Sequence, residues 1–437
     1  GQADKLTYTG SVSTIGANDI IKNNTVNVAD ALVGRLSGIT VVRPYGAQPG
    51  SKAFITVRGM NTINDASHNN DPLIIIDGVE RTSLQDDVLS LIDPNDIENI
   101  SVLKDASAAA VYGARSANGV ILITTKRGNT SRPEISYNFV FQNQRPTRLP
   151  KPLNSWEWAT LYNEAQTNDA RLPDGSIPST FKPLYSKSDI QKFKDGSDPD
   201  HFANTNWFKE ILKPSADEQQ HNLSLRGGNN AAKYFVSFGY ADQGGFIETY
   251  NFKRYNLRSN LDIDINKTLK LSVDLAGTFS QTNSPSYDGV SDLLKTSPIY
   301  PNRLNSDPSK YGAVQNANSI YNPYLQVYKS GYNNTDNTTV FSSLNATQQI
   351  VFIPGLSVSG LLSFNISKGT GKIWRKNPTL FTDDGLYYKE GVFSGASLQE
   401  RYLQYKSITM EGRINYDQQF GKHHVGGLLL FSQTKNG

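Results

Sequence analysis

The 437-residue sequence contains no cysteine, and its lysines and arginines form no block. The lack of cysteine excludes disulfides and thiolate metal sites. The formal net charge is only +3, and this even balance gives no indication of a nucleic-acid partner. No apolar run reaches the roughly 18 residues that a membrane-spanning helix needs. The five histidines show no metal-binding spacing, and neither a phosphate loop nor a Gly-x-Ser-x-Gly elbow is present. We therefore expect no metal, no cofactor and no catalytic residues.

The first part of the chain, residues 1–130, is predicted to be a mixed α/β domain. Its apolar segments are short and bounded by turn residues, as in "DPLIIIDGVE" (71–80), which predicts a strand buried on both faces. "NVADALVGRLSG" predicts a short amphipathic helix with Asn27 as its N-cap and Gly38 at its end. Asp93 and Pro94 have the residue types that begin a helical turn, and "KDASAAAVYG" (104–113) predicts another short helix.

The second part, residues 131–437, alternates apolar and polar residues with a period of two. In 268–281 the apolar residues occupy one face and the polar residues the other, and 255–265 repeats the pattern. The same pattern predicts further strands at 135–142, 219–226, 233–240, 338–351, 356–367, 402–418 and 424–432, about nine in all. Several exceed the five or six residues usual in soluble proteins and are long enough to cross a bilayer at a tilt.

The connections between these strands alternate between short and long. Short turns are predicted near residues 227, 266, 353 and 420, and longer connections at 143–218, 241–251, 282–337 and 368–400. Short turns on one side and long loops on the other are typical of an outer-membrane barrel. A secreted β-sandwich, the structural alternative, has no reason to keep every second turn tight. A globular domain followed by a barrel indicates a plug inside the barrel lumen.

Several stretches then resemble a known family. "VADALVGRLSGITVVRPYGAQPGSKAFITVRGMNTIN", "DPLIIIDGVE" and "DPNDIENISVLKDASAAAVYGARSANGVILITTKRG" look like the plug of TonB-dependent outer-membrane transporters of the SusC-like branch, over about residues 10–128. "KRYNLRSNLDI" resembles an early barrel strand of that branch. The resemblance implies a plug domain at 1–130 and the N-terminal part of a transmembrane β-barrel, with long extracellular loops, at 131–437.

The family barrel has about 22 strands around a plugged lumen. Nine strands are too few to close around such a plug, because barrel diameter grows with strand number. We therefore expect the 437 residues to be the N-terminal portion of a chain nearer twice that length. The segment that contacts TonB is expected just before the plug.

The resemblance also implies a function, the import of a glycan or peptide nutrient across the outer membrane of a Gram-negative bacterium of the Bacteroidota. Its implied partners are a SusD-like lipoprotein lid, the TonB–ExbB–ExbD complex, the substrate and outer-membrane lipid. Two alternatives remain open at this point. One is a TonB-dependent receptor for siderophores or cobalamin, and the other is a secreted β-rich glycan-binding or hydrolytic protein.

Two arginines and a polar loop are the candidate plug residues. Arg58 and Arg115 sit where the family places plug arginines against barrel carboxylates, and this implies a plug–barrel lock. The alternative is a static structural ion pair. The apex of the plug offers side chains that bond to sugar hydroxyls or peptide amides, unless the loop is simply solvated: Asn61, Asn64, Asp65, His68, Asn69, Asn70 and Asp71.

Two tryptophans are the candidate loop residues. Trp156 and Trp158 lie in "NSWEWATLYNEAQ", a predicted helix at 154–166 in the first long connection. An indole can stack on the face of a sugar ring. The alternative is that both rings anchor the loop by packing.

Overall fold

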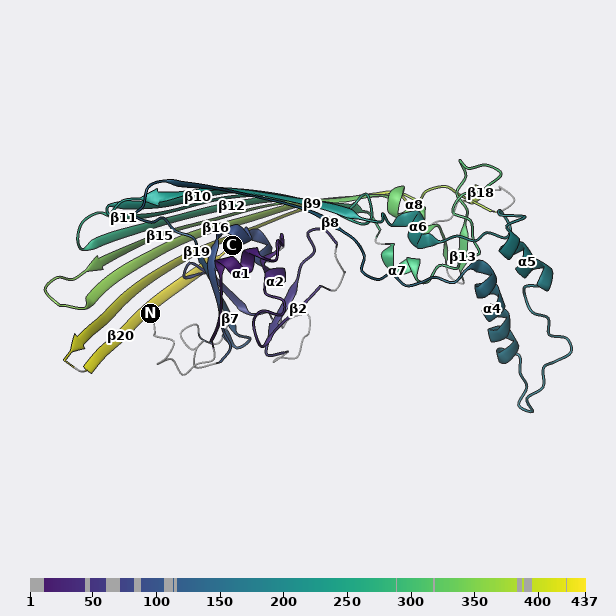
Figure 1. Ribbon diagram of the computed structural model, residues 1–437, viewed down its shortest axis with the longest axis horizontal. Helices are drawn as coiled ribbons and strands as arrows, with labels where there is room; N and C mark the ends of the chain where they lie inside the picture. Colours follow the sequence, from purple (N-terminus) through teal and green to yellow (C-terminus); the bar gives the residue numbers. More distant parts are fainter. Residues whose placement is uncertain are drawn as a thin grey trace.

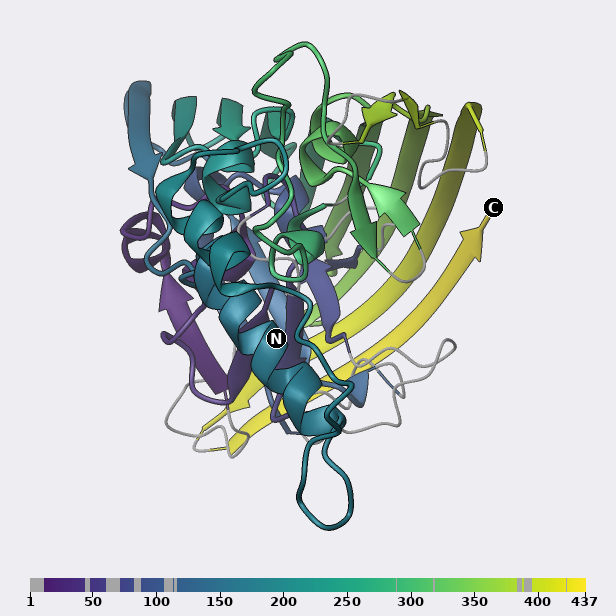
Figure 2. The same cartoon turned by 90° about the vertical axis from the view of Figure 1, so that its right-hand side faces the viewer.

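The computed structural model consists of a small mixed domain inside the concave face of a long, curved antiparallel sheet (Figure 1). Figure 2 views the molecule from one end and shows the sheet curving around this domain. Among the described residues, no helix is both long enough and apolar enough to cross a membrane. The structure describes residues 12–43, 48–59, 71–81, 88–105, 113, 116–287, 289–316, 319–382, 387–388, 395–421 and 423–437.

The large sheet, which we call the wall, has nine strands in the order β20-β19-β16-β15-β12-β11-β10-β9-β8. Each strand is antiparallel to its neighbours. The nine strands predicted from alternation are therefore confirmed. Their bounds are β8 Glu134–Gln144, β9 Ala216–Gly228, β10 Ala232–Gly244, β11 Asn251–Asp264, β12 Leu269–Pro285, β15 Gly331–Gln349, β16 Leu356–Arg375, β19 Ser397–Phe420 and β20 His423–Asn436.

The outer face of the wall carries a row of aromatic rings along one line of the strand register. Neighbouring rings on β8 to β12 have centroids 4.8, 6.0, 5.0 and 6.2 Å apart. The row consists of Phe139, His221, Tyr240, Tyr255 and Phe279. From this row toward the short turns, the outward positions are mainly apolar, as at Leu257, which is 53% exposed. A girdle of aromatic residues beside an apolar band is typical of a lipid-facing barrel surface.

Short and long connections alternate along the wall, as predicted, except at the connection between β10 and β11. The short turns comprise residues 229–231, 265–268, 350–355 and 421–422, and the long loops comprise 145–215, 286–330 and 376–396. The predicted longer connection at 241–251 is shorter than expected. β10 continues to Gly244 and β11 begins at Asn251, because their ladder extends further than the sequence alternation does.

The long loops contain most of the helices outside the small domain. α4 (Ser155–Asp169) begins with a capping box between Asn154 and Glu157, and this confirms the predicted helix. Figure 2 shows α4 crossing in front of the small domain at the open end of the wall. The other loop elements are α5 Lys187–Asp195, α6 Trp207–Ile211, α7 Val290–Leu293, α8 Pro323–Tyr328, β13 Val314–Asn316, β14 Ser319–Tyr321, β17 Leu380–Phe381 and β18 Tyr387–Tyr388.

The small domain, which we call the plug, contains a five-stranded sheet in the order β1-β6-β7-β4-β5 and a separate β2-β3 hairpin. β4 is the predicted buried strand of "DPLIIIDGVE", and it pairs parallel to β7. Side chains from the sheet and from α1 fill one apolar core, in which Ile20, Ile97 and Ile121 are fully buried. The strands are β1 Val12–Gly16, β2 Ile39–Val42, β3 Phe54–Val57, β4 Leu73–Ile76, β5 Val79–Glu80, β6 Ile97–Leu103 and β7 Val120–Thr125.

The plug helices are short: α1 Ala17–Ile21, α2 Val28–Ala31, η1 Val88–Leu91 and η2 Pro94–Asp96. Asn27 caps α2 by accepting a hydrogen bond from the Ala29 N–H at 2.9 Å, as predicted. α2 ends well before Gly38, because Gly34 takes a left-handed φ of 69° and interrupts the helix. Asp93 caps η2, also as predicted. The helix predicted at 104–113 lies largely outside the described residues.

Candidate functional site

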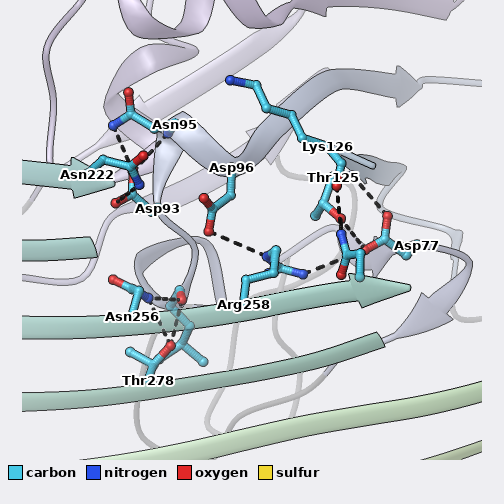
Figure 3. Close-up of polar contacts among 12 residues, drawn as sticks. Asp77, Asp93, Asn95, Asp96, Thr125, Lys126, Asn222, Asn256, Arg258 and Thr278 are labelled. Carbon is cyan, nitrogen blue, oxygen red and sulfur yellow. Dashed lines mark hydrogen bonds and ion pairs between the residues drawn. The ribbon is translucent and has the colours of Figure 1, made fainter. Parts of the chain in front are cut away.

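Arg258 is the centre of a buried charged contact between the plug and the wall (Figure 3). It projects from the inner face of β11 and is only 6% exposed. Its guanidinium lies 3.5 Å from a carboxylate oxygen of Asp96 and 3.8 Å from one of Asp77, both in the plug. A buried cation needs such partners, because an unpaired one costs several kcal/mol. The wall therefore supplies the arginine and the plug supplies the carboxylates.

Asp77 is held in an unusual backbone conformation at the turn between β4 and β5. Its φ is 51°, a left-handed value that is uncommon outside glycine. Its carboxylate accepts hydrogen bonds from the Thr125 N–H at 2.9 Å and from the Thr125 hydroxyl at 2.7 Å. These two bonds tie the end of β4 to the end of β7 and aim the carboxylate at Arg258. The strain at Asp77 thus places a charge at the plug surface.

Asp96 is fully enclosed where η2 meets the wall. Burial and the neighbouring Asp93 raise the pKa of Asp96 to about 6, although Arg258 opposes this shift. Asp93 in turn accepts a hydrogen bond at 3.1 Å from the Asn222 amide of β9. Gly239 of β10 lies so close to the Asp93 carboxylate that an added Cβ would clash with it. At η2 the wall therefore provides both space, at Gly239, and a hydrogen-bond donor, the Asn222 amide.

Arg127 makes a second charged contact, with the opposite polarity. It follows β7 and reaches two carboxylates of the wall, Asp262 at 2.9 Å and Asp274 at 3.0 Å. Ser272 and Ser343 donate hydrogen bonds to the same two carboxylates. Arginine can serve two acceptors at once because its guanidinium is a rigid fork of five donors. The segment between plug and wall is thereby fastened at the start of the barrel.

Arg81 makes a third contact, in which the wall offers neutral groups. It lies just after β5 and is 5% exposed. It donates to the Ser363 hydroxyl at 3.1 Å and to the Asn365 amide oxygen, and its guanidinium lies 4.8 Å from the centre of the Phe341 ring. Burial lowers the pKa of Arg81 to about 10, so the side chain remains charged at neutral pH.

Most other contacts join wall side chains to main-chain carbonyls of the plug. Arg254 donates to the Val26 and Ser90 carbonyls at 2.8 and 2.7 Å. The carbonyl of Leu91 accepts from both the Asn256 amide and the Thr278 hydroxyl at 2.8 Å (Figure 3). The Asn260 amide donates to the Lys126 carbonyl at 2.7 Å. A small apolar cluster of Val26 with Ala241 and Phe252 also joins plug and wall. The hydrogen bonds are more numerous, and water can replace them one by one.

Of the two predicted lock arginines, Arg58 alone lies among the described residues. Arg58 has a φ of 58° and forms an ion pair with Asp105 inside the plug, and its side chain is 49% exposed. Arg115 lies outside the described residues. Their assignment as a lock therefore stays a prediction.

The predicted plug apex is described only at one end. Asn61, Asn64, Asp65, His68, Asn69 and Asn70 lie outside the described residues. Asp71 lies 3.5 Å from the Lys52 ammonium and forms an ion pair with it. The apex therefore stays a prediction as a substrate site.

The two predicted loop tryptophans both lie on α4, half-buried. Trp158 stacks on Tyr162 with centroids 4.9 Å apart, and both rings meet Tyr185 edge-on. This packing supports an anchoring role for Trp158, which also lines a cleft described below. For Trp156 the ligand assignment stays a prediction.

The sequence analysis missed the residues that join plug and wall. Arg258 and Asp262 fall on the polar face predicted by the alternation of 255–265, and that alternation does not distinguish them from the other polar residues of the strand. The signal was available in part, since a charged residue facing a plugged lumen needs a partner of opposite charge. The identity of that partner depends on a contact between segments far apart in the chain.

Comparison with known proteins agrees with this architecture. Residues 4–120 match the model of the TonB-dependent Receptor Plug Domain. The TonB-dependent receptor P26 of Formosa agariphila is 31% identical over 97% of this chain and 39% of its own length. The TonB-dependent receptor SusC of Bacteroides thetaiotaomicron is 33% identical over 73% of this chain and 30% of its own length.

A solved structure shows the same fold. The structure of the RagAB peptide transporter superposes with a TM-score of 0.74 at 24% identity, over 99% of this chain and 49% of the matched chain. The chain thus spans about 39% of the length of the curated relative P26. On these matches, and on the plug seated in a nine-stranded wall, the chain belongs to the SusC-like branch of the TonB-dependent receptors and comprises the plug and the first part of the barrel.

Proposed function

We propose that the protein containing this chain imports a nutrient, a glycan or a peptide, across the outer membrane in a TonB-dependent cycle. One observation carries the proposal. The plug lies in the concave face of a wall whose outer surface resembles that of a lipid-facing barrel, and wall side chains hold it mainly by hydrogen bonds to the plug backbone. Such a domain blocks the lumen at rest. A pulling force can free it without unfolding the wall, because water replaces the broken hydrogen bonds.

We assign residues 1–130 to the plug and residues 131–437 to the barrel in this cycle. A SusD-like lipoprotein covers the long loops, the TonB–ExbB–ExbD complex pulls from the periplasm, and outer-membrane lipid surrounds the wall. The relatives named SusC and RagAB support these partners. Arg58 and Arg115 remain proposed as a lock, and the plug apex at 61–71 as a substrate contact.

Growth of the source bacterium on defined nutrients tests the function. Deletion of the gene is expected to abolish growth on one class of nutrient, either an oligosaccharide or a peptide mixture, and deletion of TonB is expected to have the same effect. Growth on monosaccharides and free amino acids serves as the control. Nutrient uptake that continues without TonB, or a deletion that affects only ferric-siderophore uptake, would contradict the proposal.

A further inference from the structure

A cleft of about 250 Å³ lies among the long loops, beyond the ends of the wall strands. It is bounded by the segment 150–153 that leads into α4, by Trp158 of α4, by the start of α6, and by α7 with the residues after it. Figure 1 shows these elements grouped at the end of the molecule away from the short turns. Figure 2 shows α4 at the open mouth in front of the plug.

The walls of this cleft are apolar and open to solvent. Leu153 is 44% exposed and Leu294 is 66% exposed, although both are large aliphatic residues at the cleft. Trp158 and Phe208 line it and are half-buried. A ligand that covers this surface gains roughly 25 cal/mol for each Å² of apolar area removed from water. The cleft therefore favours an apolar group.

Most of the neutral polar side chains at the cleft, those of Thr205, Trp207 and Thr296, are already hydrogen-bonded within the protein. The Trp207 indole N–H donates to the Ser297 carbonyl at 3.0 Å, and the Thr205 hydroxyl donates to the Tyr300 carbonyl at 2.6 Å. Two ammonium groups remain, on Lys151 and Lys295. Both side chains are exposed, and neither forms an ion pair with another described residue. The cleft thus combines apolar walls with uncompensated positive charge.

We propose that this cleft binds the C-terminal end of a peptide, with an apolar side chain against the leucines and the terminal carboxylate beside the two lysines. A sugar ring needs several hydrogen-bond partners for its hydroxyls, and most of the neutral polar side chains here are already occupied. Sites for whole drug-sized ligands measure about 300–1,000 Å³, so this smaller cleft takes one end of a longer molecule. A free amino acid has the same carboxylate, but its own ammonium group is repelled by the lysines.

This inference rests on the proposed function in one respect, namely that the long loops face the outside of the cell and meet the nutrient first. Binding itself needs neither TonB nor transport. A receptor that binds peptide ends but whose deletion leaves nutrient uptake normal would refute the proposed import and leave the cleft assignment standing. Normal TonB-dependent uptake without peptide binding at the cleft would refute the cleft assignment and leave the proposed import standing.

Isothermal titration of the full-length receptor in detergent micelles tests the ligand class. The probes are acetyl-Ala-Ala-Leu as the free acid, the same peptide as its C-terminal amide, free leucine, and galacturonic acid as an acidic sugar. We expect the free acid to bind at least tenfold more tightly than the amide and than free leucine. Equal affinity for acid and amide, no binding of the acid at millimolar concentration, or tighter binding of galacturonic acid would overturn the proposal.

Variants then locate the site. The double variant Lys151→Gln, Lys295→Gln is expected to reduce the affinity for the free acid to that for the amide and to leave amide binding unchanged. Retained amide binding shows that the cleft is intact. Leu294→Ser is expected to weaken both probes severalfold. Lys187→Gln, which changes a lysine of α5 outside the cleft, is the matched control and is expected to have no effect; a loss as large as that of the double variant would mean that general charge, and not the cleft, binds the acid.

Discussion

The two faces of β11 show how one strand serves two surroundings. Outward residues such as Tyr255 and Leu257 join a band in which neighbouring side chains are interchangeable as long as they are apolar. Inward residues such as Asn256 and Arg258 each meet a particular atom of the plug. Lipid constrains only the polarity of a side chain, whereas the folded plug constrains its position and its charge. We therefore call the outward, lipid-side face of the wall the tolerant face and the inward, plug-side face the demanding face.

The largest effect is expected on the demanding face, from Arg258→Met. The change leaves Asp77 and Asp96 buried without their cation, and breaking a buried pair in this way costs about 3–5 kcal/mol. We expect the plug to become accessible to trypsin in the folded barrel and the cells to become sensitive to vancomycin. Arg226→Met is the control, because its ion pair with Glu134 is 41% and 50% exposed and lies outside the plug contact. If both variants behave alike, the buried contact does not anchor the plug.

On the tolerant face, Leu275→Arg is expected to be the next most damaging change. Leu275 points outward from the middle of β12 and is 45% exposed. A charged residue near the bilayer midplane of a barrel costs about 2–4 kcal/mol. Thr282→Arg, which changes an inward residue of the same strand, should be mild. Heat-modifiable migration of the barrel on a gel measures assembly, and equal assembly of the two variants would contradict the assigned facing.

A pH dependence is expected from Asp96 on the demanding face. In the docked plug, burial and the neighbouring Asp93 raise its pKa from an ordinary 3.8 to about 6, and release into water is expected to lower the pKa again. The docked plug therefore holds a proton that the released plug loses. This contribution is full below about pH 3.8 and is lost as the pH rises through 6. Hydrogen-exchange protection of residues 88–103 should be greater at pH 5.0 than at pH 7.5, after correction for intrinsic rates. Asp96→Asn should remove the difference, and a wild-type protein without one would refute the assignment.

Arg58→Ala tests the proposed lock, and it has the smallest effect if Arg58 acts only through its ion pair with Asp105. Its ion pair with Asp105 lies within the plug and is partly exposed, and pairs of that kind contribute about 0–1 kcal/mol. The resistance of the plug to trypsin should therefore fall far less in Arg58→Ala than in Arg258→Met. A loss of protection as large as that of Arg258→Met would instead support the proposed role of Arg58 in a plug–barrel lock.

The tolerant face could be predicted almost completely from the sequence. A period of two needs no knowledge of tertiary contacts, and it located all nine wall strands and the outward side of β12. Caps were equally local, and Asn27 and Asp93 occupy the positions expected of them. The predicted helix after Asn27 was too long because Gly34 was read as a helical residue. The strand ends were misjudged because ladders continue beyond the alternation, as between β10 and β11.

The demanding face could not be predicted beyond its polarity. Arg258 and Asp77 are separated by the last part of the plug and three wall strands, and no local pattern shows that they meet. Family resemblance directed attention to Arg58 and Arg115, and it gave no information about the carboxylates of the plug. The plug carboxylates that face Arg258 are brought to it only by docking, so the three-dimensional structure is needed to identify them.

The hydrogen bonds from the wall to plug carbonyls have an evolutionary consequence. Every amino acid carries the same carbonyl, so the contacts at Val26, Ser90, Leu91 and Lys126 survive a change of side chain. Substitutions there are constrained by the plug's own folding and only weakly by its fit to the wall. Plugs of related receptors should therefore be exchangeable between barrels, provided that the few charged partners are transferred with them. Such modularity would let loops and barrels diversify toward new nutrients while the same plug domain continues to dock in the barrel.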